Sequence, residues 1–109
     1  MVYYSVTLDT TFSALSDPTR RAIVSQLAAG EASITALASP FNMSLPAVTK
    51  HIRVLEQAGL LTRKKKGRVQ YCRLNAEPLR DAAQWLAFYQ QFWDAKLDAL
   101  ANFLEEDPK

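Results

Sequence analysis

Lysine and arginine side chains gather in one part of the chain, where their number suits binding to a polyanion. Over residues 50–80, nine of these cations stand against two glutamates, a local charge of +7, whereas the other residues carry −5 and the whole chain +2. Such asymmetry is typical of a surface that binds phosphates, although a bare charge run is more often a solvated face. The nine cations are Lys50, Arg53, Arg63, Lys64, Lys65, Lys66, Arg68, Arg73 and Arg80.

Two of these cations fall on a predicted amphipathic helix over residues 44–58. At 100° per residue its apolar stripe, which we expect to face the core, comprises Leu45, Val48, Ile52 and Leu55. The opposite face holds a hydroxyl, two cations and no bulky apolar group, and comprises Pro46, Thr49, Lys50 and Arg53. A surface of this kind can enter a DNA major groove, hydrogen-bond base edges and meet phosphates.

Two polar residues of this helix each have two interpretations. Ser44 precedes the first helical residue, so its hydroxyl can cap the helix; it also lies where a phosphate would approach the positive helix end. His51, the only histidine, falls at the edge of the apolar stripe. We expect it to be partly buried and hydrogen-bonded, or to contact phosphate, because no ligand partners for metal binding or catalysis lie near it in the sequence.

A basic β-hairpin is predicted to follow the helix end at Gly59. Its strands, 61–66 and 69–74, flank a tight turn at Gly67, where a glycine lets the backbone turn sharply. The cations at its tip are Lys65, Lys66 and Arg68.

Cys72 is the only cysteine, so the chain cannot form an internal disulfide. Strand alternation places it on the same face as Gln70 and Leu74, toward the helices. We expect a small buried hydrophobe. A redox-switch thiol is the weaker alternative, because the chain has no second cysteine to resolve an oxidised one.

Capping residues predict the elements that position this helix and hairpin. Asp17 followed by Pro18 is a helix start signal, and Ser33 caps a further short helix. The residues before Asp17 predict another short helix, and the first eight residues are expected to be irregular. A turn over 40–43 then joins two helices in the helix-turn-helix arrangement. The expected helical ranges are 10–15, 18–30 and 33–40.

The last predicted helix, 78–105, is too apolar and, at about 40 Å, too long to be covered by so small a domain. Dimerisation would bury this surface, whereas a pocket for a small apolar effector is the alternative. Its apolar residues recur at spacings of three and four, with four aromatic residues beside them: Leu79, Ala82, Leu86, Tyr89, Trp93, Leu97, Leu100 and Leu104, then Trp85, Phe88, Phe92 and Phe103.

Four segments together resemble the ArsR/SmtB family of bacterial winged helix-turn-helix transcription repressors. They are Leu-Ser-Asp-Pro-Thr-Arg-Arg at 15–21, Met-Ser-Leu-Pro-Ala-Val-Thr-Lys-His-Ile at 43–52, Leu-Glu-Gln-Ala-Gly-Leu-Leu at 55–61 and Gly-Arg-Val-Gln-Tyr at 67–71. The resemblance covers nearly the whole chain, from Thr10 to Glu105.

The resemblance implies a mainly α fold with a small β-hairpin, a winged helix-turn-helix of about five helices and a two-stranded wing, in one domain over 1–109. It also implies a homodimer formed through helices 10–16 and 78–105. Carried over residue by residue, the DNA contacts are Ser44, Pro46, Thr49, Lys50, His51, Arg53, Lys65, Lys66, Arg68 and Gln70. The corresponding dimer-interface residues are Phe12, Leu15, Leu86, Tyr89, Trp93, Leu97 and Leu100.

The chain departs from the metal-sensing members of this family. Where some carry a Cys-x-Cys-like ligand set in the third helix, it has Ile-Thr-Ala-Leu-Ala at 34–38. Others use aspartate and histidine pairs in the last helix, which here has no histidine. The remaining carboxylates, Asp81, Asp94 and Asp98, suit hard cations better than transition metals. We therefore expect no metal site and no cofactor.

Composition excludes several classes of function. No apolar run approaches the roughly 18 residues of a membrane span, and no signal-peptide pattern is present, so we expect a cytoplasmic protein without membrane partners. One histidine, one cysteine and no clustered carboxylates leave no catalytic constellation, so we expect no enzyme. The expected function is a homodimeric, sequence-specific DNA-binding regulator, a repressor occluding a promoter at an inverted repeat. A winged-helix protein adaptor, or a repressor with an atypical metal or small-molecule effector site, is the alternative.

Overall fold

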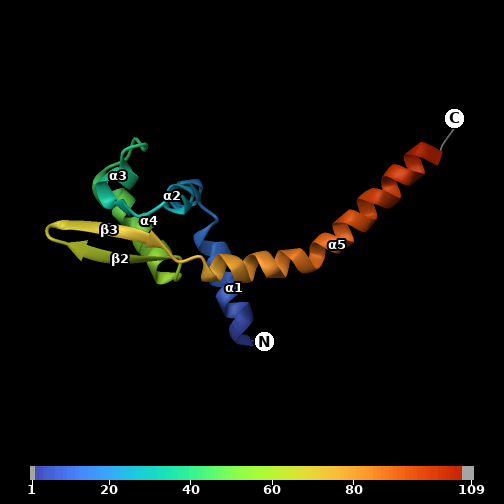
Figure 1. Ribbon diagram of the computed structural model, residues 1–109, viewed down its shortest axis with the longest axis horizontal. Helices are drawn as coiled ribbons and strands as arrows, with labels where there is room; N and C mark the ends of the chain where they lie inside the picture. Colours follow the sequence, from blue (N-terminus) through green and yellow to red (C-terminus); the bar gives the residue numbers. More distant parts are fainter. Residues whose placement is uncertain (1, 107–109) are drawn as a thin grey trace.

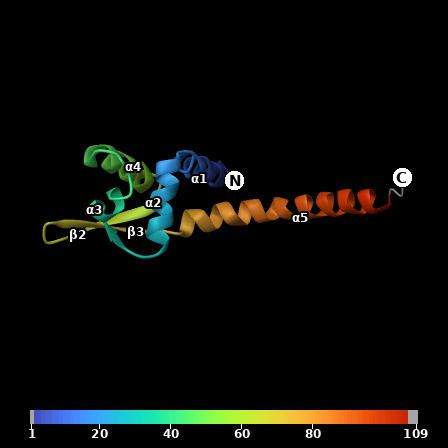
Figure 2. The same cartoon turned by 90° about the horizontal axis from the view of Figure 1, so that it is seen from above.

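The computed structural model describes residues 2–106, with side chains from residue 7 onward. Along the described chain, five α-helices and three β-strands follow one another in the order α1, α2, β1, α3, α4, β2, β3 and α5. A helical body carries the β2–β3 hairpin at one end, and α5 extends from the other (Figure 1 and Figure 2). The bounds are α1 Val2–Ala14, α2 Pro18–Ala28, β1 Ala32–Ser33, α3 Ile34–Ala38, α4 Leu45–Gln57, β2 Leu61–Lys66, β3 Val69–Leu74 and α5 Glu77–Glu106.

The predicted capping residues begin three of the helices. A carboxylate oxygen of Asp17 accepts the Arg20 N–H at 3.0 Å and starts α2, with Pro18 as its first residue. The hydroxyl oxygens of Ser33 and Ser44 do the same for α3 and α4, at 3.1 and 3.3 Å from the amide nitrogens of the third helical residues. Each cap satisfies an amide that a helix start leaves without an intrahelical partner, which confirms these three predicted starts.

The expected irregular segment over residues 1–8 is wrong for residues 2–8, because α1 runs unbroken from Val2; Met1 lies outside the described residues. No glycine or proline interrupts 2–14, and the β-branched residues there cost only a few tenths of a kcal/mol each in a helix. Leu8, only 7% exposed, is held by packing. Packing at Leu8 therefore supports helical structure in a segment for which the local sequence provides no start signal.

The wing belongs to a three-stranded sheet, so the expected two-stranded element is incomplete. Strand order is β1-β3-β2, with Ala32 opposite Cys72 and Ser33 opposite Tyr71 in an antiparallel pair. The β2–β3 register runs from Leu61 opposite Leu74 to Lys66 opposite Val69, as the hairpin prediction requires. The sequence does not predict β1, because two residues are too short to show the alternation by which a strand is detected.

One apolar core joins the helices to the sheet. The face of Cys72 is confirmed, because its side chain is fully buried in this core and burial raises the pKa of its thiol. The fully buried members of the α4 stripe are Val48, Ile52 and Leu55. The assignment of Leu45 to that stripe is wrong, since Leu45 is 49% exposed. It is the first residue of α4, one turn ahead of Val48, where the buried part of the stripe begins.

Helix α5 leaves the body after its first turns (Figure 1). Pro78 and Ala82 are its buried residues, and every position from 83 to 106 is exposed. Near the body an aromatic cluster connects it to α1: the rings of Phe12 and Trp85 meet edge to face at 5.8 Å, and those of Trp85 and Tyr89 at 5.0 Å. No helix of the described chain is both long enough and apolar enough to cross a membrane.

Candidate nucleic-acid interface

The outer face of α4 presents two cations to solvent. Lys50 and Arg53 are exposed, and neither side chain takes part in a hydrogen bond or ion pair with any part of the chain that the structure describes. With their neighbours they line a shallow hollow along the first turns of the helix. Its lining residues are Leu45, Pro46, Ala47, Thr49, Lys50 and Arg53. The structure thus brings four of the predicted groove residues, Pro46, Thr49, Lys50 and Arg53, to one surface.

The two hydroxyls on this helix are both engaged with its backbone. Ser44 acts as the N-cap described above. Thr49 donates its hydroxyl proton to the carbonyl oxygen of Leu45, one turn earlier, at 2.9 Å. Since a hydroxyl has a single proton, Thr49 can accept a hydrogen bond from a ligand here but has none left to donate.

His51 is half-buried and belongs to a polar cluster that links α4 to the α1–α2 junction. Nη1 of Arg20 lies 3.4 Å from its Nδ1, and an Asp17 carboxylate oxygen lies 3.8 Å from the same nitrogen. The Arg20 Nε also donates to the Ala14 carbonyl at 2.6 Å, at the end of α1. The expectation of a hydrogen-bonded histidine is confirmed. Accepting from Arg20 requires an unprotonated Nδ1, which leaves the ring proton on Nε2.

At the tip of the wing, the predicted DNA-binding residues fall into two groups. The side chains of Lys65 and Arg68 are exposed and form no hydrogen bond or ion pair within the described residues, so they are available to a ligand. Lys66 instead pairs with Glu31, Nζ to carboxylate oxygen 3.0 Å, and lies 5.2 Å over the Tyr71 ring. Gln70 accepts a long hydrogen bond from Arg63 at 3.4 Å. A ligand that binds Lys66 must therefore compete with Glu31.

An ion pair that the sequence does not reveal joins the wing to α4. Arg63 on β2 donates through Nη2 and Nε to one carboxylate oxygen of Glu56, at 2.7 and 3.1 Å. The hydrogen bond to Glu56 raises the pKa of the Arg63 guanidinium above its usual value. In the sequence Arg63 is only one of the clustered cations. Because the two residues sit on different elements, no helical or strand spacing relates them.

The Glu31–Lys66 pair predicts a small loss of stability in acid. The hydrogen bond from Lys66 lowers the pKa of the Glu31 carboxyl in the folded state. The unfolded chain therefore binds a proton more readily, so the pair's contribution is present above about pH 4 and is lost as the pH falls through the folded-state pKa. In urea denaturation at pH 3 and pH 6, Glu31→Gln should reduce the difference between the two midpoints. In a Lys66→Gln background the same substitution should have a smaller effect, because only the weaker attraction of Glu31 to Arg73 and Lys64 remains; an equal effect in both backgrounds would contradict the assignment.

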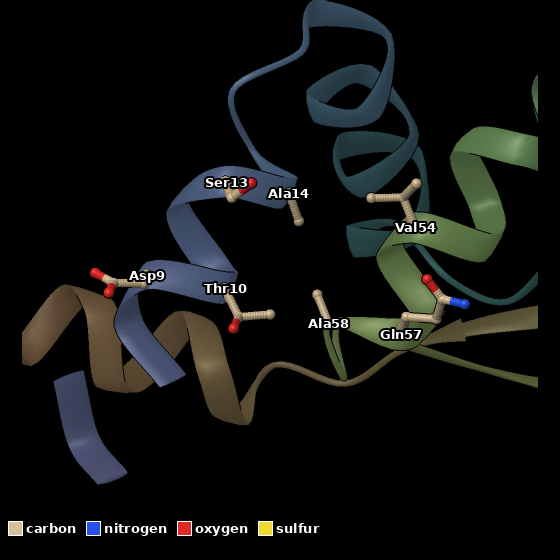
Figure 3. A pocket seen from close by; sticks show the side chains of 7 residues that line it. All are labelled: Asp9, Thr10, Ser13, Ala14, Val54, Gln57 and Ala58. Atoms are coloured by element: carbon tan, nitrogen blue, oxygen red, sulfur yellow. The ribbon is translucent and has the colours of Figure 1, made fainter. Parts of the chain in front are cut away.

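The predicted dimer-interface residues lie on two surfaces. Five are exposed on α5 beyond the body: Leu86, Tyr89, Trp93, Leu97 and Leu100. Phe12, on α1, is 38% exposed and contacts Trp85, whereas Leu15 packs partly against the chain's own core. A separate groove lies between α1 and the end of α4 (Figure 3), and neither Lys50 nor Arg53 lines it. Within the described residues, no group of three or more His, Cys, Asp or Glu side chains is placed to share a metal ion.

Similarity to known proteins agrees with this geometry. A helix-turn-helix domain family matches residues 15–64. The transcriptional repressor SdpR of Bacillus subtilis is 35% identical over 79 residues, which cover 72% of this chain and 88% of SdpR. The crystal structure of an ArsR family transcriptional regulator shares 42% identity, covers 83% of this chain and 93% of that one, and has a TM-score of 0.75.

A winged helix-turn-helix is also found among the solved structures that resemble this chain. A solution structure from Mycobacterium bovis is described as the homodimeric winged helix-turn-helix DNA-binding domain of a possible ArsR-family regulator. It is 26% identical, covers 90% of this chain and 88% of that one, and has a TM-score of 0.65. The winged helix-turn-helix prediction is thereby confirmed, and the relatives are regulators rather than enzymes. The chain belongs to the ArsR family of helix-turn-helix transcriptional regulators.

Proposed function

We propose that the protein is a homodimeric repressor that binds a specific inverted-repeat operator and occludes a promoter in the cytoplasm. One observation carries the proposal: the outer face of α4 and the tip of the wing both present cations without intramolecular partners among the described residues. A helix fits the major groove, about 12 Å wide, and a flanking cationic hairpin suits the adjacent phosphates. The repressor role is supported by the similarity to SdpR.

The DNA contacts proposed for α4 form a continuous surface. Lys50 and Arg53 would meet base edges or phosphates, and Ser44 with the first-turn amides would face a phosphate at the positive helix end. His51 would present its Nε2 proton to the backbone from the edge of that surface. On the wing, Lys65 and Arg68 are the direct candidates, whereas Lys66 and Gln70 would first have to leave Glu31 and Arg63.

The second half of the proposal is the dimer. We propose a single domain over residues 1–109, of which 1 and 107–109 lie outside the described part, with α1 and α5 forming a two-fold interface. The exposed aromatic and leucine side chains of α5 support it, because a monomer rarely leaves so extended an apolar surface in water. So does the homodimeric relative. A two-fold dimer would set two α4 helices about one duplex turn, 34 Å, apart.

Salt-dependent DNA binding tests the proposal. Lys50→Ala and Arg53→Ala should each weaken binding to a duplex that the protein selects from a random-sequence library, because each removes a cation facing the phosphates or bases. The slope of log K against log salt should become shallower by about 0.9 for each phosphate that the variant no longer neutralises. Fluorescence anisotropy over 50–300 mM salt, about the range in which such slopes are measured, gives both quantities.

Lys96→Gln is the matched control, since it removes a cation on α5, outside the proposed DNA surface, and should leave the slope unchanged. Unchanged affinity and slope in both α4 variants would sink the DNA-binding assignment for this face. That result would favour a winged-helix protein adaptor, which has no need of cations on α4.

A further inference from the structure

The first turn of α4 exposes an apolar side chain where the helix would approach DNA. Leu45 is 49% exposed, although the rest of its stripe, Val48, Ile52 and Leu55, is completely buried. It lines the same hollow as Lys50 and Arg53. Packing within the chain therefore does not account for a leucine here, because an alanine would leave the core unchanged.

Thr49 adds a second apolar group to the hollow. Its hydroxyl proton is already donated to the Leu45 carbonyl at 2.9 Å. The hydroxyl group of Thr49 is thus hydrogen-bonded to the helix backbone, whereas its methyl group makes no such bond and remains available for an apolar contact. Pro46 and Ala47 complete the apolar part of the lining, and neither side chain has a polar atom.

The cations beside the hollow decide between a protein and a nucleic-acid occupant. Lys50 and Arg53 border it, are exposed, and lack partners in the described chain. An apolar segment of protein would have to desolvate these two charges, whereas DNA neutralises them with phosphates or guanine edges. The large exposed apolar surface that suits a second copy of the chain lies instead on α5, the helix that extends away from the body (Figure 1).

The major groove displays one apolar group, the 5-methyl of thymine. We propose that the Leu45–Thr49 hollow contacts thymine methyl groups and so selects T·A pairs within each half of the operator, next to the positions that Lys50 and Arg53 reach. This inference rests on the proposed function and specifies the chemistry of its DNA target. Leu45 and Thr49 are then specificity-determining residues, although neither makes a charged or donated hydrogen-bond contact.

Uracil differs from thymine only in lacking the 5-methyl, so replacing one by the other isolates this contact. A duplex enriched by the full-length protein from a random-sequence library serves as the probe. Each thymine is replaced by deoxyuridine in turn, and affinity is measured at fixed salt. At one or more thymines in each half-site, the replacement should weaken wild-type binding about fourfold, the effect of removing one buried methyl-sized group.

Three variants assign that effect to the hollow. Leu45→Ala should bind thymine and uracil duplexes equally at the sensitive position. Thr49→Ser, which keeps the hydroxyl and removes the methyl, should reduce the uracil penalty, whereas Thr49→Val, which keeps the methyl and removes the hydroxyl, should preserve it. Leu45 is exposed and Thr49 lies at the helix surface, so all three should fold; sedimentation checks that they remain in the wild-type oligomeric state.

The outcomes separate this inference from the proposed function. If the enriched duplex shows no uracil penalty, the thymine assignment alone is overturned. A penalty of equal size in wild type, Leu45→Ala and Thr49→Ser would also overturn it, and would indicate that the methyl group acts through DNA shape. A change of oligomeric state in Leu45→Ala would overturn it in favour of a protein contact. If no sequence is enriched, sequence-specific binding fails and the inference fails with it.

Discussion

Replacing Trp93 and Leu97 of α5 by glutamate should convert the protein to a monomer and weaken operator binding by about a hundredfold or more. Both side chains are more than half exposed in the single chain, at 65% and 58%, so the substitutions disturb nothing within it. In a two-fold interface the same positions would bring four carboxylates into apolar surroundings. DNA affinity should fall because a dimer that binds one half-site holds its second α4 close to the other half-site, which raises the overall affinity. A monomer binds only one half-site and lacks this increase.

Gln91→Glu with Ala95→Glu is the matched control. It introduces the same number of charges on the side of the helix opposite Trp93 and Leu97, about 160° away at 100° per residue. Analytical ultracentrifugation measures the oligomeric state, and anisotropy the affinity. Should the Trp93/Leu97 variant remain a dimer, the interface must lie elsewhere; should it become a monomer that binds as tightly as the wild type, dimerisation is not needed for binding.

Ile52→Ala should lower the free energy of unfolding by about 2–5 kcal/mol, a large part of the 5–15 kcal/mol typical of a small protein. Ile52 belongs to α4, and its side chain is fully buried in the core that joins the helices to the sheet. Removing its outer carbons leaves a cavity that close-packed neighbours fill only partly. The effect on DNA binding should follow indirectly, because α4 rests on this side chain.

Urea denaturation at one fixed protein concentration measures this change, since a dimer's stability depends on concentration. Val54→Ala serves as the control: it sits on the same helix but is 37% exposed, so it should cost about 1 kcal/mol or less. Equal reductions for the two variants would mean that Ile52 does not anchor α4 to the core.

Local chemistry made most of the fold predictable. Asp17 and Ser44 announce helix starts through side-chain caps, and Gly67, with φ of 66°, occupies a backbone conformation that other residues avoid. Alternation fixed the register of the hairpin and the burial of Cys72. These signals depend on residues close in sequence, and they located α2 to α5, both wing strands and the last part of α1, but not the start of α1 at Val2.

What escaped prediction depends on residues far apart in sequence. β1 exists because Ala32 and Ser33 meet β3 forty residues later, and two residues carry no pattern of their own. The exposure of Leu45 follows from where the core ends, which a helical wheel cannot show. Partners within the site were hidden likewise: a charge count cannot show that Lys66 pairs with Glu31 while the Lys65 side chain has no partner among the described residues.

The Arg63–Glu56 ion pair has a mechanical consequence. It joins β2 to α4 near the corner where the chain turns at Gly59, while Leu60 and Leu61 beside it are buried in the core. The wing is therefore held against α4 by both the ion pair and the core, and under the proposed function the spacing between groove and phosphate contacts within a half-site would vary little. If α5 forms the dimer interface as proposed, a small change in its angle to the body would alter the separation of the two α4 helices more than it would alter the contacts within either half-site.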